Sequence, residues 1–195
     1  TNQSAQRIDF PCTFRVTGAA PELWDAVTGA IRPLPEFTDN GKTTTLPMVL
    51  EPNQSAFVVF REGAAAAGRA PVAKNFPEPE RVRTLDGTWT LTFQQGRRGP
   101  AEPVAVDELK DLRLSDDEAI RYFSGNVRYE TTFTLDKKEM RGRLFADTGE
   151  VGVMAKIYVN GKYAGGVWTA PYRVDITDLV RKGKNTIAID VVNTW

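Results

Sequence analysis

Aromatic and polar side chains gather in one stretch of this sequence, between residues 160 and 173. Asn160, Trp168, Tyr172 and Arg173 are the residues there whose types could recognise a ligand. An aromatic ring can lie under the apolar face of a ring-shaped ligand, while polar groups bind the ligand's rim. The stretch supplies no catalytic machinery, so we treat these four as candidate binding residues only. We expect the loops that carry them to lie at one end of a folded domain.

Packing explains the same residues without any ligand. Trp168 and Tyr172 could close the end of a β-sandwich, and Arg173 could pair with a carboxylate. Asp175 is placed to cap a turn at Thr177. Both interpretations stay open from the sequence alone.

The absence of histidine removes several kinds of active site. The chain contains 0 His and 1 Cys. No Ser-His-Asp or Cys-His arrangement, no His-ligated metal and no intrachain disulfide can therefore form within it. Cys12 alternates with Phe10 and Phe14, which predicts a buried core thiol. No spaced Asp/Asn loop of the EF-hand type is present, so we expect no metal site and no cofactor.

Charge and hydropathy argue against two classes of partner. Lys+Arg and Asp+Glu both total 25, giving a formal net charge of +0. No basic surplus is available to bind nucleic acid or an anionic membrane. No apolar run approaches the roughly 20 residues that cross a bilayer. We expect neither nucleic acid nor a membrane as partner.

The first part of the chain, residues 1–62, predicts a small antiparallel β-domain. Period-2 or apolar segments occur at 10–16, 22–25, 31–34, 43–51 and 55–61. These strands are few for a free-standing sandwich, so we interpret them as the tail of a larger domain. Residues 63–82 begin with an Ala run between glycines and continue with prolines, a composition typical of a linker. One helical turn is the alternative for the Ala run.

Residues 83–195 predict a second and larger β-domain. Trp89, Leu91 and Phe93 share one face of a strand, and residues 127–135 alternate cleanly. Ser115 precedes a short expected helix at 119–123. Asn160-Gly161 is the strongest hairpin signal, because a type I′ turn needs positive φ at both central positions. About eight strands indicate an all-β fold, an antiparallel β-sandwich of jelly-roll type.

An ordered set of short motifs carries a resemblance to a known family. The motifs are Leu85–Trp89, Leu112–Ser115, Tyr122–Gly125, Tyr129–Phe133, Asp147–Val151, Val159–Lys162, Trp168, Pro171–Thr177, Gly183–Asn185 and Val192–Trp195. Together they resemble the sugar-binding, galactose-binding-like jelly-roll domain of glycoside hydrolase family 2. The likeness is to the copy at the C-terminus of large bacterial glycosidases similar to family-106 α-L-rhamnosidases. Residues 1–62 are similar to the β-domain that follows the catalytic barrel in those enzymes.

The resemblance implies a non-catalytic C-terminal accessory fragment of a glycoside hydrolase. Its partners would be the catalytic domain of the parent enzyme, which it braces, and carbohydrate, bound through Asn160, Trp168, Tyr172 and Arg173. No residue here matches the family's catalytic carboxylates, so no catalytic residue is assigned. A periplasmic or extracellular location follows from the resemblance alone.

Two other functions stay open. A free-standing protein-binding or adhesion module would show an exposed apolar patch on one sheet. A complete glycosidase would need two carboxylates facing each other across a sugar.

Overall fold

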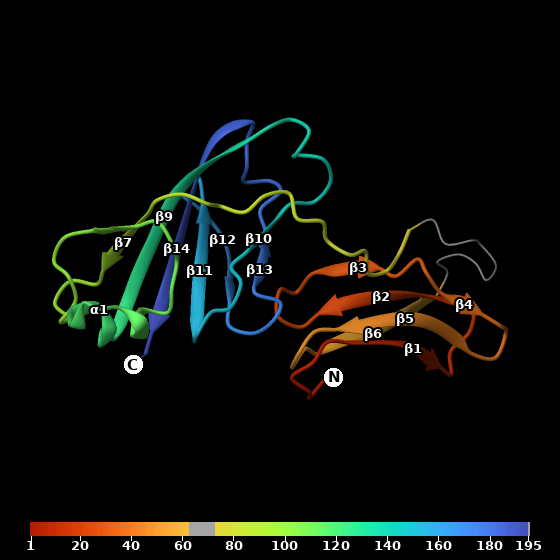
Figure 1. Ribbon diagram of the computed structural model, residues 1–195. Coiled ribbons are helices and arrows are strands. Elements are labelled where there is room, and N and C mark those ends of the chain that lie inside the picture. The colour runs from red at the N-terminus through yellow and green to blue at the C-terminus, as the bar shows by residue number, and fades with distance from the viewer. Residues whose placement is uncertain (63–72, 195) are drawn as a thin grey trace. The chain divides into compact units, whose positions relative to one another are not determined.

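A computed structural model of the chain describes residues 1–62 and 73–194. The chain divides into two compact units, Thr1–Glu80 and Arg81–Trp195. In Figure 1 the strands of the first unit run from red to orange, and those of the second from green to blue. The Ala run predicted as linker or helical turn lies outside the described residues. The division into domains at 62 and 83 stays a prediction.

The first unit consists of two antiparallel sheets of three strands each, in the orders β1-β5-β4 and β3-β2-β6. The strands are β1 (Ile8–Phe14), β2 (Ala19–Asp25), β3 (Ile31–Pro33), β4 (Thr38–Asp39), β5 (Thr44–Leu50) and β6 (Ala56–Glu62). Each of the five segments that alternation predicted contains a strand.

The core of the first unit lies between these sheets. Leu46, Met48 and Leu50 point inward from β5, and Leu23 points inward from β2. Cys12 packs against this core, as the sequence predicts, but it is half-buried and not the fully buried thiol expected. Trp24, the neighbour of Leu23 on β2, is not part of this core. Side chains alternate along a strand, so the face that buries Leu23 turns Trp24 outward.

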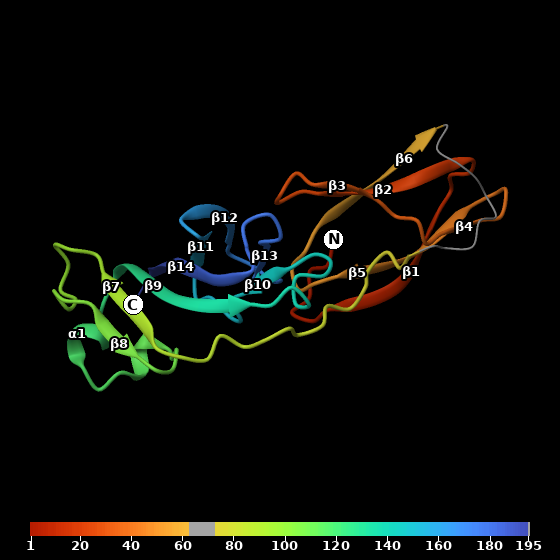
Figure 2. The same ribbon diagram turned by 90° about the horizontal axis from the view of Figure 1, so that it is seen from above.

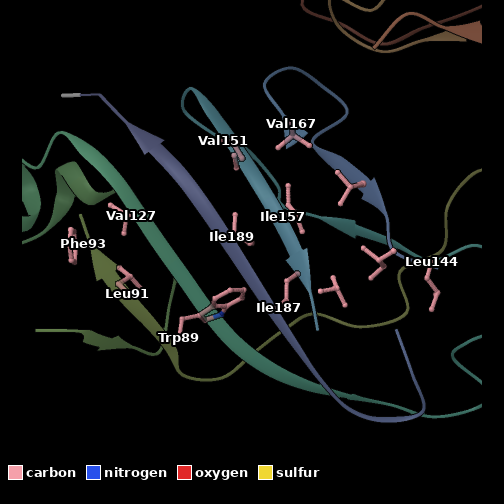
Figure 3. Packing of buried hydrophobic residues seen from close by; sticks show 14 of the residues in the cluster. Trp89, Leu91, Phe93, Val127, Leu144, Val151, Ile157, Val167, Ile187 and Ile189 are labelled. Carbon is pink, nitrogen blue, oxygen red and sulfur yellow. The ribbon is translucent and has the colours of Figure 1, made fainter. Parts of the chain in front are cut away.

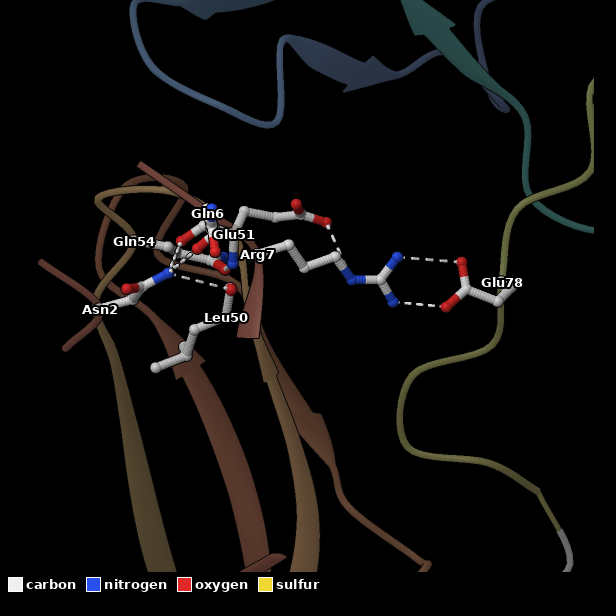
Figure 4. Close-up of polar contacts among 7 residues, drawn as sticks. All are labelled: Asn2, Gln6, Arg7, Leu50, Glu51, Gln54 and Glu78. Atoms are coloured by element: carbon white, nitrogen blue, oxygen red, sulfur yellow. Dashed lines mark hydrogen bonds and ion pairs between the residues drawn. The ribbon is translucent and has the colours of Figure 1, made fainter. Parts of the chain in front are cut away.

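Residues 73–80, assigned to the linker from the sequence, are tied to the first unit. Asn75 is 1% exposed, and its amide nitrogen donates to the Glu36 carbonyl at 2.8 Å. Arg7 pairs with Glu78 beside a cluster in which Asn2 donates to the Glu51 carbonyl at 2.9 Å (Figure 4). The folded unit therefore includes chain on both sides of the stretch 63–72.

The second unit is an antiparallel β-sandwich, as predicted. A six-stranded sheet has the order β12-β11-β14-β9-β7-β8, and β10 pairs with β13 in a two-stranded sheet. The strands are β7 (Trp89–Phe93), β8 (Val104–Val106), β9 (Gly125–Leu135), β10 (Phe145–Asp147), β11 (Met154–Val159), β12 (Lys162–Val167), β13 (Arg173–Asp175) and β14 (Gly183–Asn193). The long strands β9 and β14 run side by side through the sheet (Figures 1 and 2).

One face of the six-stranded sheet makes the core of the second unit. Trp89, Leu91 and Phe93 of β7 are 5%, 2% and 2% exposed, so the predicted alternation is confirmed. They continue across the sheet into Val127, Ile157 and other apolar side chains (Figure 3). The opposite face carries the polar members of each strand. The strand pattern thus leaves a broad polar face on this sheet.

Helix is limited, in the described residues of this unit, to the 3₁₀ turn η1 (Leu112–Leu114) and α1 (Glu118–Arg121). The sequence predicts this helix, but its cap is Asp117 and not Ser115. The Asp117 carboxylate accepts from the Ala119 N–H at 2.8 Å. The acidic run before the helix therefore serves its N-terminus.

The β11–β12 hairpin turns at Asn160-Gly161, as predicted. Both residues have positive φ, 51° and 77°, which the two-residue type I′ turn requires. The pairing of β11 with β12 shifts register between Ile157 and Tyr158. The extra residue is Ala164 of β12, and it is followed by Gly165, whose φ is 155°.

Candidate functional site

Three of the four candidate binding residues lie in and beside the loop that joins β12 to β13. Val167, 4% exposed, anchors the end of β12 in the core. The next residue, Trp168, is 54% exposed. Tyr172 packs half-buried against the core, and its carbonyl accepts from the Thr148 N–H at 2.8 Å and the Thr148 hydroxyl at 2.9 Å. The loop thus has a fixed base and an exposed aromatic ring.

Arg173 leads the chain from this loop into β13. It lies directly opposite Asp147 of β10 in the sheet register. Its Nε is buried and has no hydrogen-bond partner among the described residues. The expectation that Arg173 pairs with a carboxylate is not met, because no carboxylate oxygen of the described residues lies within salt-bridge distance. An unpaired buried donor is costly, and its burial leaves only the terminal guanidinium nitrogens of Arg173 accessible to a ligand.

The fourth candidate, Asn160, lies elsewhere. Lys162 of β12 pairs with Val159, whereas Val167 pairs with Ala155 at the far end of the same hairpin. Asn160 therefore lies at the opposite end of the hairpin from Trp168, about 16 Å along the strand at the usual rise of about 3.3 Å per residue. The expectation that all four residues share one end of the sandwich is wrong.

The Asn160 side chain is fully engaged inside the protein. Its amide nitrogen donates to the Leu179 carbonyl and to Asn185 Oδ1, both at 2.8 Å. Its Oδ1 accepts from the Thr186 N–H at 3.1 Å. Asn160 thus holds two loops together.

Asn185 is the residue of this region that sequence reasoning missed. It is 0% exposed, and its amide donates to the Arg181 carbonyl at 2.7 Å and the Gly183 carbonyl at 2.9 Å. Its Oδ1 also accepts from the Arg181 N–H at 2.9 Å. In the sequence, Asn185 and Thr186 follow Gly183 and therefore look like the end of a turn. The only sign of a structural role for Asn185 is that a polar residue stands at the start of an apolar strand.

Asp175 is a capping residue, as the sequence predicts. Its carboxylate accepts from the Thr177 N–H at 2.9 Å and from Arg143 Nη2 at 2.7 Å. Burial raises its pKa, but these bonds outweigh the burial and lower the pKa below the usual range. Asp175 stays ionised and bound within the fold.

Five carboxyl groups of the described residues have a clearly shifted pKa, and the direction of the shift is the same in each. A general acid at a glycosidic bond needs a raised carboxyl pKa. The carboxyl groups with a clearly shifted pKa are all shifted downward, at Glu22, Asp39, Asp111, Glu139 and Asp175. Burial, with the Asp111 charge, raises the pKa of Tyr129 to about 12, which suits a core phenol.

Two further kinds of feature are absent from residues 1–62 and 73–194. No group of three or more His, Cys, Asp or Glu side chains is placed to hold a metal ion. None of the helices there has the length and apolar character needed to cross a bilayer.

Part of the second unit matches a known family of domains. Residues 107–195 match the family described as glycosyl hydrolase 2 galactose-binding domain-like. The resemblance seen in the sequence is therefore confirmed over this range, and it agrees with the sandwich described above.

Individual relatives are large glycosidases. A rhamnosidase from Novosphingobium sp. PP1Y matches 99% of this chain at 39% identity with a TM-score of 0.88. A protein named "Putative beta-glucuronidase" from Formosa agariphila is 36% identical over 133 residues, 65% of this chain. The β-glucuronidase of Ruminococcus gnavus shares the fold over 60% of the chain, with a TM-score of 0.50 at 20% identity.

The chain spans only a small part of these relatives. It covers 18% of the rhamnosidase, 11% of the Formosa protein and 23% of the Ruminococcus enzyme. Most of each relative therefore lies outside the matched region.

Proposed function

Because residues 107–195 carry the galactose-binding-like module of glycosyl hydrolase 2 enzymes, we propose that this chain is a non-catalytic accessory part of a larger glycoside hydrolase. In this role it braces the catalytic domain, and its parent is an α-L-rhamnosidase-like enzyme. One observation carries the proposal. Almost the whole chain, 99% of it, matches a rhamnosidase at 39% identity, yet the match covers only 18% of that rhamnosidase. The lowered carboxyl pKa values described above support the non-catalytic part.

Carbohydrate binding is the second part of the proposal, and it belongs to the β12–β13 loop. Trp168 offers an exposed ring, and the Arg173 guanidinium offers a donor that the described protein leaves unused. Tyr172 holds the loop's exit in place. A sugar needs both a ring platform and polar rim contacts, and this loop supplies them. Asn160 is left out of this binding set because its amide is already occupied.

The substrate class and the location follow from the relatives. A rhamnose-containing polysaccharide is the substrate class we propose for the parent enzyme. Polysaccharide does not enter the cytoplasm intact, which supports a periplasmic or extracellular location.

The test has a catalytic and a binding arm. The purified chain is assayed with aryl α-L-rhamnosides and aryl β-glucuronides, and no turnover above background is expected. Calorimetry then measures binding of L-rhamnose and D-galactose oligosaccharides to the wild type, Trp168→Ala and Tyr122→Ala. Tyr122 is the matched control because it is another aromatic ring exposed in this unit, at 65%.

The outcomes separate the two parts. Turnover by the isolated chain would overturn the non-catalytic role. Binding that Trp168→Ala abolishes and Tyr122→Ala leaves intact supports the loop as the sugar site. Binding that Trp168→Ala leaves unchanged in both affinity and stoichiometry removes the loop from the proposal.

A protein-binding module is the second candidate function, and one observation favours it. The outward face of the β3-β2-β6 sheet carries one apolar row, Ile31–Trp24–Phe57, and the adjacent row places Glu22 between Pro33 and Val59. Ile31 is 54% and Phe57 63% exposed. The Trp24 indole donates to Glu22 at 3.0 Å, and Arg61 lies 5.6 Å from its ring centroid, so the ring is held in place. Such a patch is typical of a surface that docks protein.

The bracing and the protein-binding functions predict different partners for this face. The chain is mixed with the Novosphingobium rhamnosidase lacking its matching segment, and association is measured by ultracentrifugation. Bracing predicts a complex that Phe57→Ser weakens and Val27→Ser, an exposed apolar control, does not. If no complex forms with the truncated enzyme, the result contradicts the bracing function. The protein-binding function then remains as the explanation of the apolar patch.

A further inference from the structure

A groove lies on the polar face of the six-stranded sheet, away from the β12–β13 loop. Its volume is about 390 Å³, within the usual range for small-molecule sites. The lining residues are Thr88, Thr90, Arg128, Glu130, Thr131, Thr132, Tyr158, Gly161, Thr186, Ile187 and Ala188. None of the candidate residues Trp168, Tyr172 and Arg173 lines it.

The register of the sheet explains why the groove exists. Thr90 pairs with Glu130, Glu130 with Ala188, and Ala188 with Tyr158, so these side chains form one row across four strands. Ala188 has a single methyl group between two long neighbours. The next row carries the pair Thr132 and Thr186, which are also short. Small side chains between large ones leave a depression in the sheet surface.

One wall of the groove is an aromatic ring held between two neighbours. The guanidinium carbon of Arg128 lies 5.5 Å from the Tyr158 ring centroid. On the hairpin side, the rings of Tyr158 and Tyr163 lie 5.5 Å apart at a 58° tilt. Tyr163 is 58% exposed. The ring wall is thus built before any ligand arrives, which lowers the entropic cost of binding.

The polar groups of this face include both donors and acceptors. Arg128 Nε lies 3.2 Å from Glu130, and its Nη1 donates to Asp190 at 3.0 Å. Within the described residues its Nη2 makes no hydrogen bond, so it remains a donor for a ligand. Glu130 and Asp190 retain carboxylate lone pairs as acceptors, and threonine hydroxyls can do either.

The charges that line the groove cancel, because Arg128 and Glu130 are its two charged residues. Elsewhere on the same face lie Lys156, Lys184 and Asp190, and Lys156 pairs with Asp190 in register. A groove lining with no net charge does not attract phosphate or sulfate. A neutral ligand with adjacent hydroxyls and one apolar ring face matches the side chains instead.

We propose that this groove is a second saccharide site, for a neutral pyranose with vicinal hydroxyl groups. The Tyr158 ring, with Arg128 packed over it, forms one wall beside the sugar ring, and Glu130 and Arg128 Nη2 bind the sugar's hydroxyls. The proposal rests on the carbohydrate role proposed above but assigns it to a different surface. Two sites on one module would let it hold two sugar residues of a chain at once.

The experiment is a titration of the isotope-labelled chain, followed by the amide NMR signals of each residue. The probes are methyl α-L-rhamnopyranoside and methyl β-D-galactopyranoside, with D-glucuronate as the charged comparison. The expected result is saturable shifts at Glu130, Thr132 and Thr186 with the neutral probes, at least tenfold weaker with glucuronate. Tyr158→Ala should weaken the neutral binding at least tenfold, whereas Trp168→Ala and the control Tyr122→Ala should leave it unchanged.

Any other outcome contradicts the proposal that the groove binds a sugar. Shifts confined to the β12–β13 loop would leave the proposed function standing and remove this site. No shift at either surface would remove both. Because Tyr158→Ala also removes a packing contact, its melting temperature is compared with that of the wild type. A second variant, Glu130→Gln, removes an acceptor on an exposed side chain and should also weaken binding.

Discussion

At the scale of single residues, the paired asparagines Asn160 and Asn185 matter more for the fold than for a ligand. Both side chains satisfy backbone groups of loops that no sheet ladder reaches. Such groups are expensive to leave unpaired once they are buried.

Replacing Asn185 with Ala is expected to destabilise the second unit by about 2 kcal/mol, because the Arg181 N–H and the Asn160 amide each lose a partner. Urea unfolding of the chain measures the loss. Asn126→Ala is the control, since Asn126 is exposed. Equal midpoints for the two variants would show that the pair does not hold the loops.

The ionised Asp39 side chain stabilises the first unit, and this stabilisation is lost in acid. Its carboxylate accepts from the N–H groups of Gly18 and Gly41 and from the Thr17 hydroxyl, which together lower its pKa. Because the pKa of Asp39 is lower in the folded than in the unfolded chain, its contribution to the free energy of unfolding is complete above the unfolded pKa of about 3.9. The contribution is lost as the pH falls from there through the folded pKa.

Asp39→Asn should therefore flatten the dependence of the melting temperature on pH between about pH 4 and pH 2. The melting temperatures of the variant and the wild type are compared at pH 6 and pH 2.5. Asp9→Asn, an exposed acid on β1, serves as control. The interpretation fails if both variants lose stability in acid as steeply as the wild type.

At the scale of elements, alternation predicted the strands well but not which face of each is buried. Trp24 and Leu23 are neighbours on β2, and either face could have been the core from the sequence alone. The decision depends on Leu46 and Met48 of β5, which are distant in sequence. The row Glu130–Ala188–Tyr158 likewise needs the register of three strands, which no local pattern encodes.

The bulge in β12 depends on Gly165. A Cβ there would lie 3.0 Å from Val174 Cγ1, and the φ of 155° is unfavourable for other residues. Gly165→Ala should cost about 1–3 kcal/mol and disturb the nearby Trp168 loop.

Gly152→Ala is the matched control, because a Cβ at Gly152 meets no atom within 4 Å. Thermal unfolding and the NMR signal of the Trp168 indole N–H in both variants provide the comparison. A Gly165→Ala protein as stable as Gly152→Ala would rule out strain at the bulge.

At the scale of the whole molecule, the chain has two separate apolar cores. The one in the first unit centres on Leu46 and the one in the second on residues such as Ile157. Composition predicted a chain large enough for two cores but could not show which residues build each. The Pro-rich stretch 73–80 was predicted to be part of a linker. Its sequence contains no sign of the contacts of Asn75 and Glu78, because their partners lie far away in sequence.

Leu46→Ala should destabilise the first unit by about 2–5 kcal/mol through the cavity it leaves. Hydrogen exchange of β1, β2 and β5 should then accelerate, while exchange in β9 and β14 stays at the wild-type rate. The reciprocal variant Ile157→Ala should do the reverse. Matching acceleration in both units would mean that they unfold as one.

The bulge of β12 has one more consequence, for self-association. β12 is an edge strand of the six-stranded sheet, and an edge exposes backbone groups that can pair with another chain. The register shift at Ile157/Tyr158 interrupts the regular ladder there and increases the local twist. A second molecule therefore finds no flat, continuous template along this edge, and the sheet is protected against growth into aggregates.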